Sequence, residues 1–110
     1  MISATIRRNS AGRIIAFQLQ NHGDPLVCAC VSFLVQNTAN SIEALTDVPF
    51  TFEYNPEGGF LQMELENKGQ ASDSANILLE SMALGLRALR ESYSDDILVD
   101  DIKIEDDIYD

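Results

Sequence analysis

The chain has 110 residues, of which 45% are hydrophobic and 23% are charged, and its formal net charge is -11. This length predicts one domain, in which folding buries roughly 60–70% of the surface that the unfolded chain exposes. The hydrophobic fraction excludes wholesale disorder. The negative charge argues against nucleic acid or an anionic membrane as the main partner, since both would repel the protein, whereas a basic protein or peptide would be attracted.

No apolar run in the sequence approaches the ~20 residues that a membrane-crossing helix needs, and residues 1–20 lack the layout of a signal peptide. We therefore expect a soluble, cytoplasmic protein that binds no membrane. Cys28 and Cys30 are expected to be free thiols of a reducing compartment, because at this spacing on a helix they point about 200° apart. One histidine and two cysteines at this spacing predict no metal site, and we expect no cofactor.

The first twenty residues have the pattern of a β-hairpin. Residues 2–8 alternate loosely between apolar and polar side chains, as a half-buried strand does. Asn9-Ser10-Ala11-Gly12 is typical of a turn, and residues 13–20 resume the alternation. His22 comes just after this second predicted strand.

A helix is predicted next, because apolar residues recur at helical spacing from Val27 to Leu45. Pro25 stands just before this stripe, where a proline ends a loop and fits close to a first helical turn. The segment Thr46-Asp47-Val48-Pro49 ends the helix. The result is one apolar face about five turns long.

A second hairpin and a second helix follow. Residues 50–55 and 60–65 alternate as strands around the turn Pro56-Glu57-Gly58-Gly59. Ser72 or Asp73 is the expected N-cap of a helix from about Ser74 to Tyr93. Gly85 within this helix costs up to ~1 kcal/mol relative to alanine, which suggests close packing against a neighbour.

A final short strand is predicted from residues 97–99 and 102–104. The element order ββα-ββα-(β) then predicts an α+β fold, a two-layer sandwich in which two helices cover a largely antiparallel sheet. From Glu91 onward the chain has nine acidic residues and one base, Lys103. The simplest account of this end is a solvated tail, so we divide the chain into a single domain, residues 1–105, and an acidic tail, residues 106–110.

The stretch from Asn21 to Ser32 holds the only histidine and both cysteines of the chain. A thiol becomes a useful nucleophile when its thiolate is stabilised, which a helix N-terminus and a neighbouring imidazole both do. The loop between His22 and Cys28 contains glycine and proline and is able to fold the two side chains together. Taken alone, Cys28 is more often a buried structural cysteine and His22 a loop histidine bonded to backbone. The helix start and the nearby histidine make the two readings of Cys28 about equal, and the position of His22 relative to Cys28 favours the catalytic reading of the histidine.

The neighbouring residues have alternative readings too. Asp24 either orients His22 or caps the helix, and the sequence does not favour one over the other. Ser32 lies one turn after Cys28, where it either hydrogen-bonds at the site or, more commonly, bonds back to a helix carbonyl. Cys30 is on a different helical face from Cys28, and we expect it in the core.

The motif Asn21-His22, followed by a loop into Val27-Cys28-Ala29-Cys30-Val31-Ser32, resembles the ribosomal-processing cysteine protease family, Prp. The Asn40–Leu45 segment, the Gly58-Gly59-Phe60-Leu61 turn and the Leu78-Leu79-x-x-Met82 helix also resemble it in order. The resemblance implies a small bacterial endopeptidase, commonly a homodimer, with Cys28 as nucleophile and His22 as general base. It also implies a substrate: a large-subunit ribosomal protein, the twenty-seventh of the L series, whose N-terminal extension is removed after an aromatic residue.

For the mechanism we expect His22 to take the proton of Cys28 and backbone N–H groups at the helix start, including that of Cys28, to hold the oxyanion. The acidic composition suits a basic ribosomal substrate. The alternative function is a non-enzymatic, acidic, ribosome-associated binding module, which the loop Gly23–Val27 favours because it is shorter than in many family members. A peroxide-sensing thiol is a third possibility, but Cys30 is badly placed to resolve it.

Overall fold

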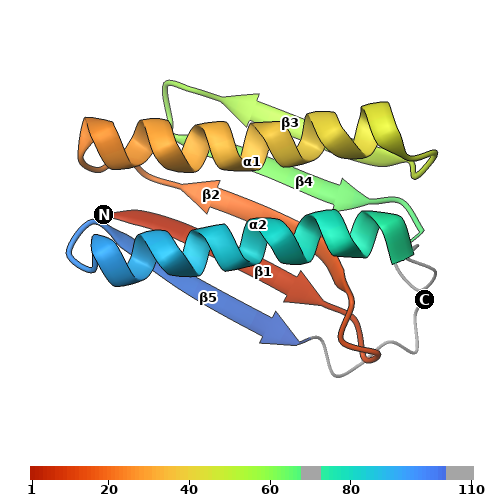
Figure 1. The fold of residues 1–110 in the computed structure, drawn as a ribbon. Helices are drawn as coiled ribbons and strands as arrows, with labels where there is room; N and C mark the ends of the chain where they lie inside the picture. The colour runs from red at the N-terminus through yellow and green to blue at the C-terminus, as the bar shows by residue number, and fades with distance from the viewer. Residues whose placement is uncertain (68–72, 104–110) are drawn as a thin grey trace.

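Five strands and two helices alternate in the order ββαββαβ in a computed structural model, which describes residues 1–67 and 73–103 (Figure 1). The elements are β1 (Ile2–Arg8), β2 (Ile14–Gln20), α1 (Pro25–Leu45), β3 (Phe50–Asn55), β4 (Phe60–Leu65), α2 (Asp73–Ser92) and β5 (Ile97–Lys103). The predicted α+β sandwich is confirmed. The expected cap at Ser72, the strand residue Ile104 and the acidic tail 106–110 lie outside the described residues.

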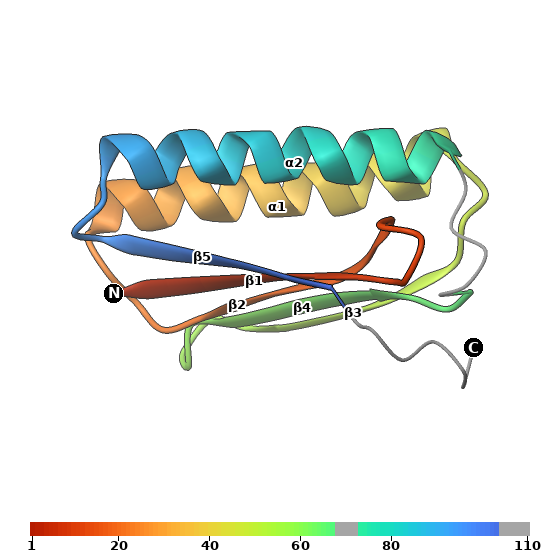
Figure 2. The ribbon, with the colours of Figure 1, turned by 90° about the horizontal axis from the view of Figure 1, so that it is seen from below.

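The strands form one sheet with the order β3-β4-β2-β1-β5. Both predicted hairpins are present as antiparallel pairs, and β4 also pairs antiparallel with β2. β5 lies parallel to β1, from the pair Ile2–Ile97 to the pair Arg8–Lys103. The two short segments predicted at the end of the chain therefore form one continuous strand. Both helices cover the same face of this sheet (Figure 2).

The core lies between the helices and the sheet because each strand turns alternate side chains toward the helices. On β4, for example, Leu61, Met63 and Leu65 are buried, whereas Gln62 and Glu64 between them are not. The helices contribute their apolar stripes to the same layer. The buried residues of these stripes are Val27, Val31, Val35, Thr38, Ala39 and Ile42 on α1 and Ala75, Leu79, Met82, Ala83 and Leu86 on α2.

The two helices approach each other closely at Gly85. A β-carbon added there would lie 2.8 Å from Cδ2 of Leu34 on α1. Glycine lets the Leu34 side chain come this close, because a β-carbon at 85 would displace its methyl groups, at the cost of the helix propensity that alanine would supply. The close packing predicted at this position is confirmed.

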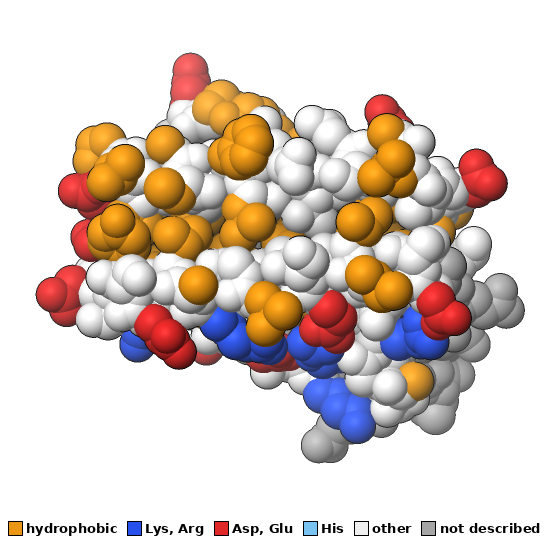
Figure 3. All heavy atoms as spheres, viewed as in Figure 1, with side chains coloured by type: hydrophobic (Ala, Val, Ile, Leu, Met, Phe, Trp, Pro, Cys, Tyr) orange, Lys and Arg blue, Asp and Glu red, His pale blue; other side chains and the backbone are white. Residues whose placement is uncertain are grey.

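Helix α1 corrects one expectation from the sequence. Its 21 residues contain a stretch with mean hydropathy 1.2, so by length and composition alone the helix is long and apolar enough to cross a membrane. One side of α1 packs in the core, as shown above. Other large apolar side chains of the helical layer remain exposed, among them Leu26, Phe33 and Leu45 on α1 and Ile77 and Leu84 on α2. Figure 3 shows hydrophobic side chains spread over this outer face, with charged groups gathered along its α2 side.

Arg8 joins three elements at the side of the molecule away from β3. Its guanidinium donates to the carboxylates of Glu80 on α2 and Asp101 on β5, and Arg87 on α2 donates to Asp101 as well. The hydrogen bonds from Arg8 lower the pKa of Asp101 below its usual value, and the bonds to Glu80 and Asp101 raise the pKa of Arg8. This network fixes the parallel edge strand β5 and helix α2 to β1.

Candidate active site

A cavity of about 90 Å³ opens at the end of the sheet, beside the first turns of α1. Both candidate catalytic residues, His22 and Cys28, line it. Its other lining residues come from both hairpins and from α1, and are Ile2, Leu19, Asn21, Val31, Ser32, Tyr54, Pro56, Gly59, Phe60 and Leu61. The wall is mainly apolar, with His22, Cys28 and Ser32 among its polar or ionisable members, as expected of a ligand site.

Cys28 is held in the first turn of α1 by the cap of the helix. The helix begins at Pro25, and the Asp24 carboxylate accepts from the N–H groups of Leu26 and Val27. The N–H of Cys28 donates to the carbonyl of Asp24 at 2.9 Å. These contacts correct the expected oxyanion site, because the amides of the first helical turn, that of Cys28 included, already have partners.

Both backbone polar groups of Gly23 face the sulfur. The Gly23 N–H donates to Cys28 Sγ at 3.3 Å, and the Cys28 thiol donates to the Gly23 carbonyl at 3.8 Å. Gly23 is enclosed, since an added β-carbon would lie 3.1 Å from a side-chain carbon of Ile2 and 3.3 Å from the carbonyl oxygen of Asp96. The sequence places this glycine in a loop, but nothing in its spacing shows that its N–H points at the thiol.

His22 is oriented by the turn between β3 and β4. Nε2 of its ring lies 3.2 Å from the carbonyl oxygen of Glu57. Asn21 before it has a positive φ of 72°, which few non-glycine residues adopt, and such positions cluster at functional sites. Gly59 packs against this segment, since a β-carbon there would lie 2.8 Å from the Asn21 carbonyl and 3.1 Å from Nε2 of His22.

The histidine and the cysteine share the cavity, but in the described part of the chain no hydrogen bond joins them. Nε2 of His22 is occupied by the Glu57 carbonyl, which leaves Nδ1 as the ring atom able to accept a proton. Hydrogen bonds between catalytic groups are often long before substrate binds and tighten afterwards. The arrangement therefore provides a thiol, an oriented imidazole and a backbone donor around one apolar cavity.

The remaining residues singled out in the sequence separate into three cases. Asp24 caps the helix, and among the described residues its side chain makes no hydrogen bond to His22. Ser32 lines the cavity, and the described contacts include no hydrogen bond of its hydroxyl to a helix carbonyl. Cys30 is exposed on α1, so its expected place in the core is wrong. No group of three His, Cys, Asp or Glu side chains suited to a metal ion is present within residues 1–67 and 73–103.

Known cysteine proteases resemble this chain over nearly its whole length. A family model described as cysteine protease Prp matches residues 1–98. The ribosomal processing cysteine protease Prp of Bacillus subtilis is 29% identical over 107 residues, which cover 90% of this chain and 96% of the relative. The protein of the same name from Staphylococcus aureus is 25% identical over 103 residues, 88% of this chain and 95% of the relative.

Solved structures share the fold. The S. aureus essential ribosomal processing protease Prp, crystallised with a covalently linked product peptide, superposes with a TM-score of 0.84 at 25% identity, covering 92% of this chain and 99% of that one. A protein of Streptococcus mutans gives a TM-score of 0.83 at 26% identity, covering 94% and 99%. The chain belongs to the cysteine protease Prp family and is a cysteine peptidase.

Proposed function

We propose that this protein is a cytoplasmic endopeptidase that removes the N-terminal extension of a large-subunit ribosomal protein, the twenty-seventh of the L series, with Cys28 and His22 as its catalytic dyad. The observation that carries the proposal is their meeting at one apolar cavity, with the Gly23 N–H directed at the sulfur. The B. subtilis relative is named a ribosomal processing cysteine protease, and the S. aureus relative was crystallised with a covalently linked product peptide, which agrees with covalent catalysis.

The contacts of the ring support the following mechanism. Nε2–H of His22 donates to the Glu57 carbonyl, so the neutral imidazole accepts the Cys28 proton at Nδ1. The thiolate then forms a bond to the substrate carbonyl carbon, and His22 returns the proton to the leaving amine as the C–N bond breaks. Water, deprotonated by His22, hydrolyses the thioester and releases the new carboxylate.

The negative charge that develops in these steps needs a backbone donor. The first-turn amides donate to Asp24, so we assign this role to the N–H of Gly23, which faces the thiol and is freed from Sγ once the sulfur bonds to the substrate carbon. One such donor typically changes kcat by about 10²–10³-fold. The carbonyl of Glu57 acts through His22 alone, by fixing which ring nitrogen carries the proton.

An exposed apolar surface supports the homodimer that the family resemblance implies. Exposed Phe33 on α1 and Leu84 on α2 belong to the apolar outer face of the helices. Large apolar patches on soluble proteins commonly mark contacts with other molecules, and the same patch on two copies is self-complementary across a two-fold axis. We propose that two copies of the chain associate through this face, which leaves the cavity on the β3 side accessible.

The test is cleavage of the natural precursor. The purified protein is incubated with the extended ribosomal protein encoded by the same genome, and the new N-terminus is sequenced. We expect a single cut that removes the extension, abolished in Cys28→Ala and retained in Cys30→Ala, whose thiol is exposed on another face of the helix. A Cys28→Ala protein that still cleaves at this site would refute the dyad. Binding of the precursor without any cleavage by the unmodified protein would favour the non-enzymatic binding module.

A further inference from the structure

The two edges of the sheet differ in how they are protected. Edge strands expose unpaired backbone groups, and proteins commonly guard them with charged side chains. β5 has three charged residues among its seven, and Asp101 among them is tied into the Arg8 network. β3, at the other edge, has one charged residue among its six, Glu53. The edge formed by β3 is therefore open to pairing with another strand.

The register of the β3–β4 hairpin shows which backbone groups are free. In an antiparallel pair, alternate residues direct both polar groups at the partner strand. The N–H of Glu66 donates to the carbonyl of Pro49 at 3.1 Å, and with the regular register this places the odd-numbered residues of β3 in the hydrogen-bonded pairs. The N–H and C=O groups of Phe52 and Tyr54 consequently point away from the sheet.

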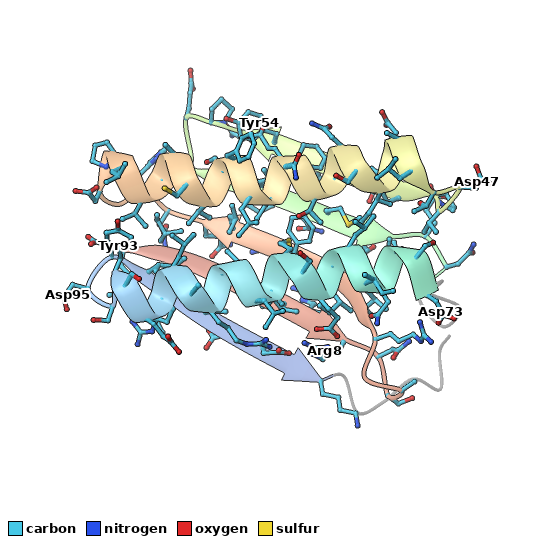
Figure 4. All side chains as sticks on the ribbon, in the orientation of Figure 1. Arg8, Asp47, Tyr54, Asp73, Tyr93 and Asp95 are labelled. Atoms are coloured by element: carbon cyan, nitrogen blue, oxygen red, sulfur yellow. The ribbon has the colours of Figure 1, made fainter. Side chains whose placement is uncertain are left out.

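The side chains of the same two residues lie on the helix-covered face of the sheet, and that of Tyr54 reaches the candidate active site. Phe52 pairs with Met63 and Tyr54 with Leu61, which are buried on the helix-covered face. Phe52 is 40% and Tyr54 54% exposed, and Tyr54 lines the cavity together with Cys28. Figure 4 shows Tyr54 beside α1 on its β3 side.

The side of helix α1 that carries Cys28 and Ser32 faces the edge formed by β3. Leu34 contacts Gly85 of α2, so this side of α1 faces the other helix. At 100° per residue, Cys28 and Ser32 lie on the opposite flank, toward β3, and both line the cavity with Tyr54. The free edge of β3 thus leads to the nucleophile.

We propose that the substrate binds as an extended segment that adds to the free edge of β3, pairing its backbone with Phe52 and Tyr54 and entering the cavity beside Cys28 with its scissile bond. This proposal rests on the proposed function. Strand addition draws affinity from main-chain hydrogen bonds and specificity from pockets for alternate side chains, here the cavity that Tyr54 of β3 lines together with Cys28 and Ser32 of α1. Glu53 and Glu57 are exposed along the edge and the turn, and the whole chain carries a net charge of -11, which suits a segment containing Lys or Arg.

The test uses two substitutions at one position. Phe52→Pro removes the outward N–H, which makes no bond to β4, and proline is tolerated where a strand N–H faces solvent. Phe52→Ala removes the same side chain but keeps the N–H, and is the matched control. Both are made in a Cys28→Ala background, and affinity for a labelled peptide spanning the precursor cleavage site is measured by fluorescence anisotropy. We expect the dissociation constant to be about fivefold to tenfold higher for Phe52→Pro than for Phe52→Ala.

A second measurement keeps the proposal testable if the proline variant does not fold. Peptides methylated on one backbone nitrogen at a time are bound to the Cys28→Ala protein, and strand addition predicts weakened binding at every second position. Equal affinities of the Phe52→Pro and Phe52→Ala proteins, or a methylation series without alternation, would overturn strand addition. Both of these results would overturn strand addition without showing that the protein does not cleave the precursor. An unmodified protein that binds the precursor but never cuts it would refute only the proposed function.

Discussion

Replacing Gly59 with alanine tests the orientation of His22. The residue has a φ of +62°, and an added β-carbon would lie 2.8 Å from the carbonyl of Asn21 and 3.1 Å from Nε2 of His22. The left-handed backbone costs alanine roughly 1–2 kcal/mol, and relieving the overlap adds about 1–3 kcal/mol. A total of about 2–5 kcal/mol is less than most of the 5–15 kcal/mol range of domain stability, so we expect a folded but weakened protein.

The effect on catalysis is expected to exceed the effect on stability. Relief of the overlap moves the ring away from the Glu57 carbonyl, and a shift of about 1 Å in a catalytic group costs on the order of 10²-fold in rate. We expect kcat to fall by this factor, with a smaller change in KM.

Gly58→Ala is the matched control. Its β-carbon would approach only the Asn55 side chain, at 3.8 Å, and Gly58 is not among the residues with positive φ. Peptide cleavage at saturating and limiting substrate gives kcat and KM, and urea unfolding gives stability. A folded Gly59→Ala protein with full kcat, or an equal loss in Gly58→Ala, would refute the role of this turn in orienting His22.

Three further outcomes are expected. Asp101→Asn destabilises the fold by about 1 kcal/mol at neutral pH. The folded-state pKa of Asp101 lies below its ordinary 3.8, so this stabilisation is present above pH 3.8 and is lost as the pH falls through the lowered pKa. The urea midpoints of the variant and the parent protein should therefore converge in acid. A difference between the midpoints that stays constant with pH would count against the pairing with Arg8. Gly85→Ala gains about 1 kcal/mol of helix propensity but overlaps with Leu34, which costs about 1–3 kcal/mol, so we expect a net destabilisation of up to about 2 kcal/mol. In a Leu34→Ala background the same substitution should be neutral or stabilising, and additive effects of the two changes would be inconsistent with the contact. For the proposed homodimer, Phe33→Ser is expected to lower the molar mass from light scattering after size exclusion toward that of a monomer; a dimer that persists in the variant would show that the helical face is not the interface.

Local patterns in the sequence predict the elements of the fold well. The alternation in residues 50–55 and 60–65 and the helical stripe from Val27 to Leu45 depend on near neighbours, and each corresponds to an observed element. Gly85 marks the helix contact because glycine in a helix is unfavourable unless another group needs the space. Cys30 was wrongly expected in the core, because amino-acid type does not show which way a side chain points from a helix whose apolar stripe is wide.

The chemistry of the site depends on contacts that no local pattern contains. The carbonyl of Glu57 reaches His22 across 35 residues of sequence, and backbone atoms carry no sequence signature. The Gly23 amide faces the thiol only because Asp24 starts the helix where it does, and the same cap occupies the amides expected to form the oxyanion site. The glycines at 23 and 59 were visible as loop residues, but the reason for each is a close approach of distant chain segments.

The most direct test of the dyad is residue-resolved alkylation. Limiting iodoacetamide is added to the unmodified protein and to His22→Ala, and mass spectrometry of the digested chain gives separate rates for Cys28 and Cys30. If solvent exposure alone set the rate of alkylation, the exposed Cys30 would react faster than the half-buried Cys28. If His22 activates the thiol, Cys28 reacts faster than Cys30 and loses this advantage in His22→Ala. A Cys28 that reacts more slowly than Cys30 in the unmodified protein, at a rate that His22→Ala leaves unchanged, would contradict the catalytic assignment.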